Sequence, residues 1–250
     1  MPSFTDHLGR TIFLPRVPRR IVSLVPSQTE LLYSLGLDEA VAGITKFCIH
    51  PEAWFHTKPR IGGTKAIDAA RVDALHPDLI IANKEENEKP QIEALANRYP
   101  VWISDVKNLE DALAMIRAVG SLTDTAGRAT AIAGEIAREF AGLSDERSVA
   151  AGRGDDRDDA FPPAAYFIWK DPWMVAGKDT FIDDMLRHCG FRNIYADTER
   201  YPSVQLSDLA ALARPVILLS SEPYPFRQRH VKEVSEVLPH ATILLVDGEL

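Results

Sequence analysis

Ile21-Val22-Ser23-Leu24-Val25-Pro26-Ser27-Gln28-Thr29-Glu30-Leu31-Leu32 is the stretch that decides the fold. Its first five residues form a short apolar run that is typical of a buried strand. From Thr29 to Leu37 the apolar residues recur at helical spacing, and Gly36 is a natural helix end. The stretch therefore predicts a strand that leads directly into a helix.

The same alternation of strand and helix continues along most of the chain. Strands are predicted at 41–44, 78–82, 101–104, 164–169, 174–176, 216–220 and 242–246. Helices are predicted at 72–75, 89–98, 109–119, 181–189, 206–212 and 227–237. Such alternation is typical of βαβ units. We therefore expect an α/β fold of two lobes, each with a central, mostly parallel sheet flanked by helices.

One long alanine-rich helix, predicted at 123–143, has no strand beside it. About twenty helical residues span roughly 30 Å, which is long enough for a backbone helix that joins two lobes. The predicted organisation is an N-terminal lobe at 1–122, the linking helix at 123–143 and a C-terminal lobe at 144–250. Residues 144–163 are predicted to form a polar surface loop, and we interpret its Arg-Gly-Asp triplet at 153–155 as solvated loop rather than an adhesion motif.

The composition excludes several classes of protein. The 250 residues are 46% hydrophobic and 26% charged, as in an ordinary globular protein, and the formal net charge is -8. This charge argues against nucleic-acid binding and against adsorption to anionic membranes. Cys48 and Cys189 form no CxxC pair and are interpreted as buried free thiols. No stretch is long enough to span a bilayer, and residues 1–20 lack the apolar region of a signal peptide.

Ligands of open parallel α/β sheets bind at the carboxyl ends of the strands. The corresponding loops are 26–30, 45–50 and 83–87 in the first lobe, and 170–173, 221–226 and 247–249 in the second. We expect these loops to line a cleft between the lobes that holds a small molecule.

The first loop offers Pro26, Ser27, Gln28 and Thr29 as ligand-binding residues. Free backbone N–H groups of the helix start would face the ligand, and we expect Gln28 to touch it. The alternative is that Ser27 or Thr29 only caps the helix, with Glu30 completing a capping box.

The remaining candidate ligand-binding residues come from the other loops: Lys46, His50, Lys84, Glu85, Glu86, Asn87, Trp169, Trp173, Tyr224 and Phe226. The aromatic residues suit a flat, amphipathic ligand. Two alternatives stay open. Residues 83–87 could be an acidic helix start, and the aromatic side chains could be core.

Neither metal ligation nor phosphate binding has a compact signature in this sequence. The scattered Cys, His, Asp and Glu residues include His50 and Glu85 as weak metal candidates, and no metal site is expected. Gly177-Lys178-Asp179-Thr180 lacks the upstream glycine of a P-loop, so Asp179 or Thr180 is interpreted as a helix cap. No nucleophile elbow or other compact catalytic motif is present, which favours a binding protein over an enzyme.

Several motifs together resemble the class III, TroA-like substrate-binding proteins of ABC transporters, and most closely their vitamin B12-binding branch. They lie at 20–32, 35–37, 74–81, 175–181 and 189–194. The resemblance implies a monomer that holds cobalamin, a siderophore or haem between its lobes, with no required cofactor. It also implies a periplasmic or cell-surface location and docking on an ABC permease through one acid per lobe. Asp208 matches the second-lobe acid, and Asp68 is the carboxylate nearest to the first-lobe position.

Two other functions remain open at this point. A cytoplasmic ligand-binding or sensor protein could use the same fold if Met1 is the native start. An enzyme that acts on a metal tetrapyrrole could use it as well.

Overall fold

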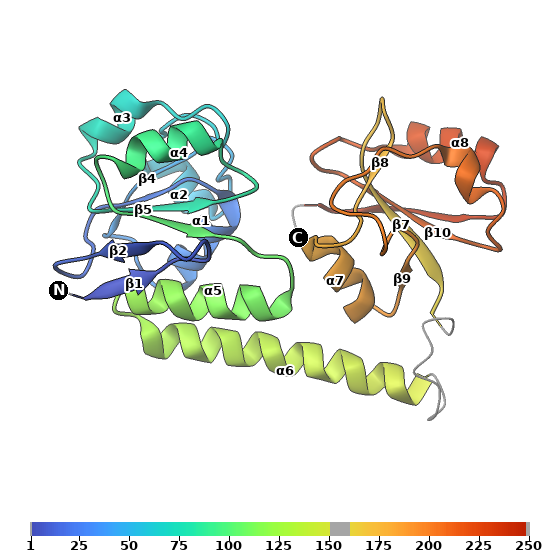
Figure 1. Cartoon of the computed structure of the whole chain (residues 1–250), viewed down its shortest axis with the longest axis horizontal. Coiled ribbons are helices and arrows are strands. Elements are labelled where there is room, and N and C mark those ends of the chain that lie inside the picture. Colours follow the sequence, from blue (N-terminus) through green and yellow to red (C-terminus); the bar gives the residue numbers. More distant parts are fainter. Residues whose placement is uncertain (1, 151–160, 249–250) are drawn as a thin grey trace. The chain divides into compact units, whose positions relative to one another are not determined.

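The computed structural model describes residues 2–150 and 161–248 (Figure 1). The chain divides into two compact units. Unit 1 comprises Met1–Asp105 and Asp111–Ile136, and unit 2 comprises Val106–Glu110 and Ala137–Leu250. Each unit contains its own sheet and its own apolar core.

The sheet of unit 1 consists of four parallel strands in the order β4-β3-β5-β6. These are β3 (Ile21–Ser23), β4 (Val41–Ile44), β5 (Leu79–Asn83) and β6 (Val101–Ser104). The helices α1 (Pro26–Ser34), α3 (Ala69–Ala74) and α4 (Lys89–Ala96) lie on the connections between these strands, and α5 (Leu109–Leu122) follows β6. The apolar runs predicted from the sequence are these strands, which are buried on both faces, as parallel strands are.

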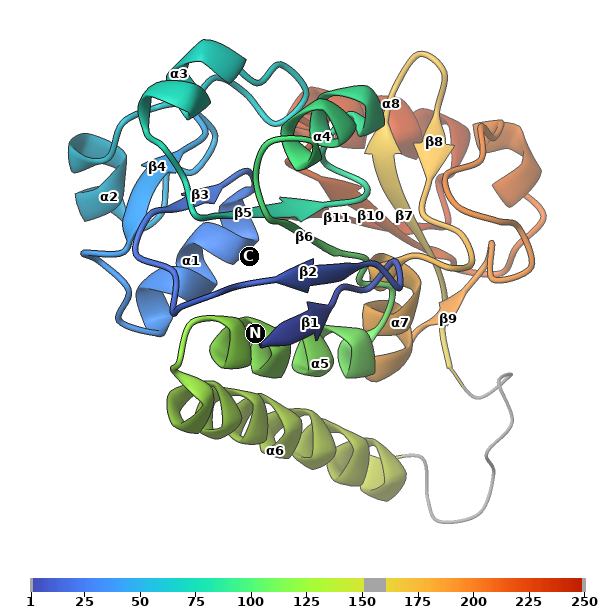
Figure 2. The same cartoon turned by 60° about the vertical axis from the view of Figure 1, so that its left-hand side comes forward.

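Alternate side chains of the strands divide the core of unit 1 into two layers. Ile21, Leu79 and Ile81 pack with α1 and α5, whereas Val22 and Ile80 pack with α3 and α4. Figure 2 shows α3 and α4 on the opposite side of this sheet from α5. Successive side chains of each strand therefore point to opposite faces of the sheet and meet the helices that cover each face.

The sheet of unit 2 has the order β11-β10-β7-β8, with β9 paired to β7. Its strands are β7 (Pro163–Trp169), β8 (Met174–Val175), β9 (Arg192–Asn193), β10 (Val216–Ser220) and β11 (Thr242–Val246). Strands β7, β10 and β11 are parallel, and β8 is antiparallel. The 3₁₀ helix η2 (Leu206–Leu209) and α8 (Gln228–Val237) cover one face, and α7 (Phe181–His188) packs on the other. The predicted α/β fold with mostly parallel sheets is confirmed.

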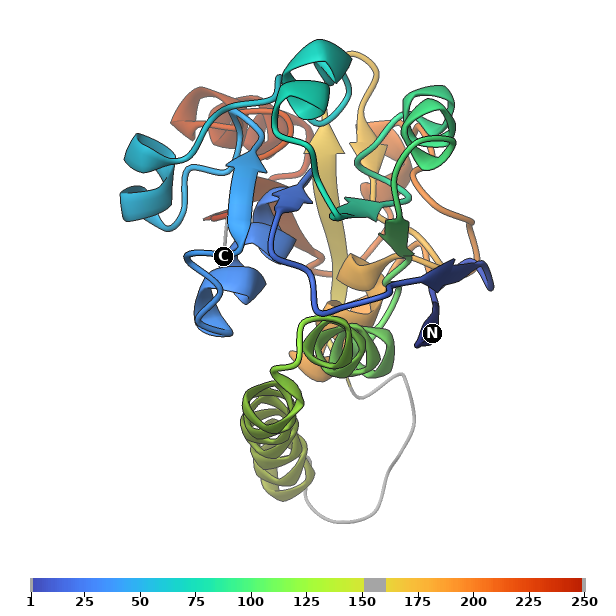
Figure 3. The ribbon, with the colours of Figure 1, turned by 90° about the vertical axis from the view of Figure 1, so that its left-hand side faces the viewer.

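The long helix α6 (Ala126–Ala150) contributes residues to both units, because the boundary between them falls after Ile136. It runs beside α5 (Figure 3), and the two helices approach closely at Gly120, where a Cβ atom would lie 2.2 Å from the Ala129 Cβ. The prediction that the helix ends at 143 is wrong. No glycine or proline interrupts 144–150, so the helix continues there instead of forming loop. The remainder of the predicted loop at 151–160, with the Arg-Gly-Asp triplet, lies outside the described residues.

Some elements were not predicted. The hairpin of β1 (Ser3–Thr5) and β2 (Thr11–Phe13), the helix α2 (Glu52–Thr57) and the two-residue β9 are too short to give a clear periodic signal. Cys48 is buried as predicted, but Cys189 is exposed because it follows α7 as its C-terminal cap. None of the helices in the described part of the chain has the length and apolarity that crossing a bilayer requires.

Candidate functional site

The candidate site of unit 1 is the surface formed by the loops that follow its parallel strands, which we call the unit 1 edge. These loops are the start of α1 after β3, residues 45–51 after β4 and residues 84–88 after β5. All the strands are parallel, so their carboxyl ends lie at the same edge of the sheet. Sheets of this kind bind ligands there.

The helix α1 begins at Pro26, with Val25 as a cap residue whose side chain makes no capping hydrogen bond. The prediction that Ser27 or Thr29 caps the helix, with Glu30 in a capping box, is therefore wrong. Proline favours the first helical position, so the helix starts earlier than its apolar spacing indicated. Ser27 is exposed, and the N–H groups of the first turn have no partner within the helix.

Gln28 and Thr29 point into unit 1. Gln28 is 1% exposed, and its amide Nε2 donates to Ser104 Oγ and to the Ala82 carbonyl at 3.3 Å. Its Oε1 is buried and has no hydrogen-bond partner among the described residues. The Thr29 hydroxyl lies 2.8 Å from Ser23 Oγ. Of the four residues predicted in this loop, Pro26 and Ser27 are therefore the ones with accessible side chains.

The loop after β4 carries Lys46 and His50, both exposed. It also exposes two side chains that the sequence analysis missed, Phe47 at 51% and Ile49 at 39%, on either side of the fully buried Cys48. The signal was present as apolar residues on alternate positions of a loop that follows a buried strand. Cys48 is held inside by contacts of its Sγ with the hydroxyls of Thr29 at 3.1 Å and Thr45 at 3.2 Å.

The loop after β5 is built around two asparagine side chains. Asn83 Oδ1 accepts the backbone N–H groups of Glu85 at 2.9 Å and Glu86 at 3.1 Å. Asn87 is 7% exposed; its Oδ1 accepts the Asn83 N–H at 2.9 Å, and its amide donates to the Thr64 carbonyl at 2.9 Å. Lys84 forms an ion pair with Asp105. The Asn87 side chain therefore holds the loop together, and Glu86 is left exposed.

A turn at 63–66 also belongs to the unit 1 edge, because hydrogen bonds attach it to the loops after β4 and β5. The Gly63 N–H donates to the Ala66 carbonyl at 2.9 Å, and the Lys46 N–H donates to the Gly62 carbonyl at 2.8 Å. Gly62 has a φ of +101°, which favours glycine. The Lys46 hydrogen bond places this turn against the loop after β4.

The candidate aromatic residues of unit 2 range from exposed to fully buried. Trp169 is 41% exposed, and its ring centroid lies 5.5 Å from that of Tyr224 in an edge-to-face arrangement. Phe226 is 4% exposed and stacks on Trp173 at 5.9 Å, with an interplanar angle of 6°. Trp169 thus offers accessible aromatic surface and Phe226 belongs to the core, whereas Trp173 and Tyr224 are half-buried and both pack against that core.

A buried histidine supports this cluster. His230 is 2% exposed, and its Nδ1 accepts the Arg227 backbone N–H at 2.9 Å. Burial lowers the pKa of His230, and the positive charges of Arg229 and Lys170 lower it further. The ring is therefore held in its neutral form, 5.4 Å from the centroids of Tyr224 and Phe226.

Among the described residues, no group of three or more His, Cys, Asp or Glu side chains could hold a metal ion. His50 and Glu85, the weak metal candidates, therefore belong to no such group. Thr180 caps α7 by accepting the Asp183 N–H at 3.2 Å, which confirms that residues 177–180 are a turn and helix cap.

The two carboxylates predicted to dock on a permease have different surroundings. Asp68 caps α3 by accepting the Arg71 N–H at 3.1 Å, and its side chain is 44% exposed. Asp208 is exposed in η2. Burial raises the pKa of Tyr195, and the negative charge of Asp208 raises it further.

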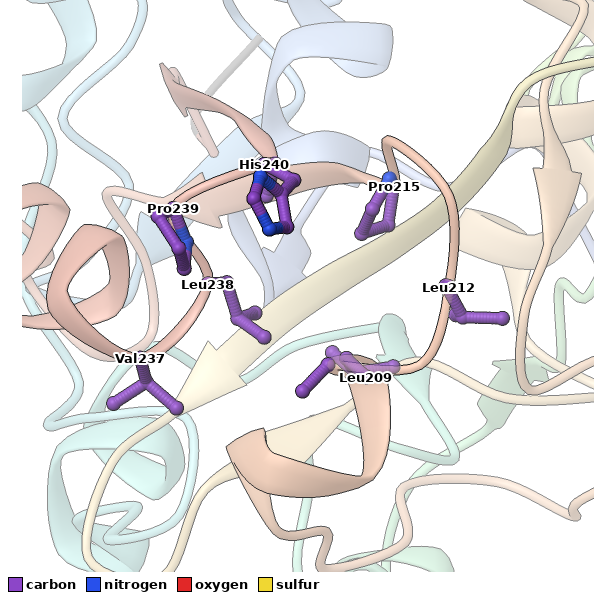
Figure 4. A pocket seen from close by; sticks show the side chains of 9 residues that line it. Leu209, Leu212, Pro215, Val237, Leu238, Pro239 and His240 are labelled. Atoms are coloured by element: carbon purple, nitrogen blue, oxygen red, sulfur yellow. The ribbon is translucent and has the colours of Figure 1, made fainter.

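A small apolar pocket of about 250 Å³ lies elsewhere on unit 2 (Figure 4). Leu209, Leu212, Pro215 and Val237 contribute to its wall. Pro215 precedes β10, so the pocket lies toward the amino ends of the strands, away from the loops considered above.

Comparison with known proteins identifies the family. The family model described as "Periplasmic binding protein" matches residues 21–237. A vitamin B12-binding protein from Pectobacterium atrosepticum is 28% identical over 75% of this chain, which spans just under two thirds, 66%, of that relative.

Solved structures share the fold. A periplasmic haem-binding protein from Pseudomonas aeruginosa has a TM-score of 0.76 at 22% identity, covering 94% of this chain and 86% of its own. An Fe³⁺-hydroxamate transport protein from Saccharomonospora viridis has a TM-score of 0.69 at 18% identity, covering 98% and 91%. The chain belongs to the periplasmic binding protein family, a non-enzymatic component of transport, which confirms both the resemblance and the expectation of a binding protein.

Proposed function

We propose that this member of the periplasmic binding protein family is the ligand-binding component of an ABC-type uptake system for a metal chelate. The candidate ligands are a corrinoid such as cobalamin, haem and a ferric siderophore. In this proposal each unit contributes the loops at the carboxyl edge of its own sheet.

One observation carries the proposal: large apolar side chains are exposed at the carboxyl edge of each sheet, which is where sheets of this kind bind ligands. Phe47 and Ile49 on unit 1 and Trp169 on unit 2 are 51%, 39% and 41% exposed. Burial of apolar surface contributes about 25 cal/mol per Å², so a large planar ligand that covered these side chains would bind favourably. Relatives of this chain include binders of vitamin B12 and haem, which are ligands of this shape and size.

The proposal includes an extracytoplasmic location and a permease partner. Asp68 and Asp208 are the proposed docking carboxylates, because both are exposed and each lies on a different unit. Reversing the charge with Asp208→Lys should reduce uptake of the identified ligand by cells while its affinity for the purified protein stays the same. An unchanged uptake rate would remove Asp208 from the docking surface.

The ligand assignment is tested by titrating the purified protein with cyanocobalamin, haemin, ferrioxamine and ferric citrate. Tryptophan fluorescence and the thermal midpoint report binding. At least one of these probes should bind at micromolar concentration or below. If none shifts either signal, the proposed function is wrong. Fractionation of cells is the second test, and a protein found only in the cytosol would argue for a cytoplasmic binder or sensor.

A further inference from the structure

Two lysines of the unit 1 edge are distinguished by having no carboxylate partner. Lys58, Lys84 and Lys89 of unit 1 pair with Asp38, Asp105 and Glu93 respectively. Lys46 and Lys65 are exposed and form no ion pair with any residue that the structure describes. In a chain with a net charge of -8, two uncompensated cations on adjoining loops make a local positive region.

The loops bring these lysines together with apolar surface. The Lys46 ammonium lies 5.0 Å from the centroid of the Phe47 ring, so its charge is held beside an exposed aromatic face. Lys65 belongs to the turn at 63–66, whose Gly63 lies against the Lys46 stem. A Cβ atom on Gly63 would be 3.4 Å from Lys46 Cε and 3.0 Å from Phe47 Cε2.

A loop with an exposed negative charge lies beside this positive region. Lys84 is compensated by Asp105, and Glu86 is exposed on a loop that Asn87 ties to the same turn through Thr64. An anionic group on a ligand would be attracted to Lys46 and Lys65 and repelled by Glu86. The apolar part of the same ligand would cover Phe47 and Ile49.

We infer that Lys46 and Lys65 bind a carboxylate of the ligand, so that the cargo is an anionic metal chelate with an apolar face rather than a neutral corrinoid. This inference rests on the proposed function and narrows its ligand class. Cation–π contact with Phe47 holds the Lys46 ammonium in place, which reduces the entropy lost when it engages the carboxylate.

The test compares haemin with haemin dimethyl ester, which keeps the macrocycle and lacks the charged carboxylates. Dissociation constants are measured by absorbance for the wild type, Lys46→Gln, Lys65→Gln and the double variant. The matched control is Lys89→Gln, an exposed lysine on α4. Each of the two substitutions should weaken haemin binding about twofold to fivefold, as expected for solvent-exposed ion pairs, and should leave the ester unchanged. Added salt should weaken haemin binding in the wild type and have less effect in the double variant.

Ferric citrate, cyanocobalamin, ferrioxamine and inorganic phosphate complete the set of probes. Binding of ferric citrate that is weakened by either substitution also supports the inference. If cyanocobalamin or ferrioxamine is the only chelate that binds, the inference is wrong and the proposed function stands. The inference is also wrong if the double variant and the Lys89→Gln control have equal affinity for haemin. Tight binding of phosphate alone that depends on the two lysines would contradict it as well. If no chelate binds, both the inference and the proposed function fail.

Discussion

The side-chain amide of Asn87 donates a hydrogen bond to the Thr64 carbonyl at 2.9 Å and thereby joins two loops of the unit 1 edge. The same side chain accepts the Asn83 N–H at 2.9 Å. Asn87→Ala would leave both backbone groups without these partners in a buried place. We expect the free energy of unfolding to fall by about 1–3 kcal/mol, measured by urea unfolding.

The control for this prediction is Asn97→Ala, because Asn97 is exposed at the end of α4. Its stability should stay within about 0.5 kcal/mol of the wild type. Affinity for the identified ligand should fall in Asn87→Ala, because the turn that carries Lys65 loses its attachment. Equal stability of the two variants would show that the Asn87 contacts are dispensable.

The sequence predicted well which strands and loops form this site. It predicted poorly which of the loop side chains are exposed. The strands at 41–44, 101–104 and 216–220 have the predicted bounds, because runs of apolar residues identify buried parallel strands. The strand at 242–246 also has the predicted bounds, although it is an edge strand with no buried residue. The loops that follow them were therefore predicted as well. Whether a loop residue faces solvent depends on hydrogen bonds between distant segments, such as Asn87 with Thr64, and sequence spacing does not report those.

Gln28 and Phe47 illustrate the two kinds of error. Gln28 is polar and lies on the predicted loop, yet its amide is buried against Ser104 of β6. Phe47 is apolar and was passed over, yet its ring is 51% exposed. Polarity alone predicts exposure in most loops, but it fails at both of these residues.

Two glycines of the α5–α6 pair should respond to alanine in opposite directions. Gly142 lies within α6, and a Cβ atom there would meet nothing within 4 Å, so Gly142→Ala should stabilise the protein by about 0.5–1 kcal/mol. At Gly120 the added Cβ would lie 2.2 Å from the Ala129 Cβ. Gly120→Ala should therefore force the helices apart and destabilise the protein by about 1–3 kcal/mol. Thermal unfolding measures both, and a stabilised Gly120→Ala would contradict the close packing.

Trp169 and Trp173 should separate ligand binding from core packing. Trp169→Ala removes a side chain that is 41% exposed, so it should weaken ligand binding severalfold and lower the unfolding free energy less than Trp173→Ala does. Trp173 stacks on Phe226 and meets Phe167 edge-on at 5.6 Å. Trp173→Ala should therefore destabilise the protein by at least about 2 kcal/mol. Calorimetric titration and urea unfolding of both variants check this, and the reverse pattern would place Trp173 in the binding surface.

The stability of the protein should depend on the protonation of His230. Burial, with the positive charges of Arg229, Lys170 and Arg227, lowers the pKa of His230 in the folded state, and Glu233 opposes this only in part. The unfolded chain has the usual histidine pKa near 6.5 and so binds more protons than the folded chain over the pH range just below that value. The contribution of neutral His230 is therefore fully present above about pH 6.5 and is lost as the pH falls toward the lowered pKa.

His230→Gln isolates this contribution, because glutamine can still accept the Arg227 N–H but does not titrate. Between pH 7.5 and pH 5.5 the wild type should lose more unfolding free energy than His230→Gln, measured by urea unfolding at each pH. The exposed His240 provides the matched control, and His240→Gln should follow the wild-type curve. Protonation would also cancel the Nδ1 acceptor that positions Arg227 at the start of α8, so the ring contacts of Tyr224 should loosen over the same pH range. Parallel curves for the wild type and His230→Gln would show that His230 does not control this behaviour.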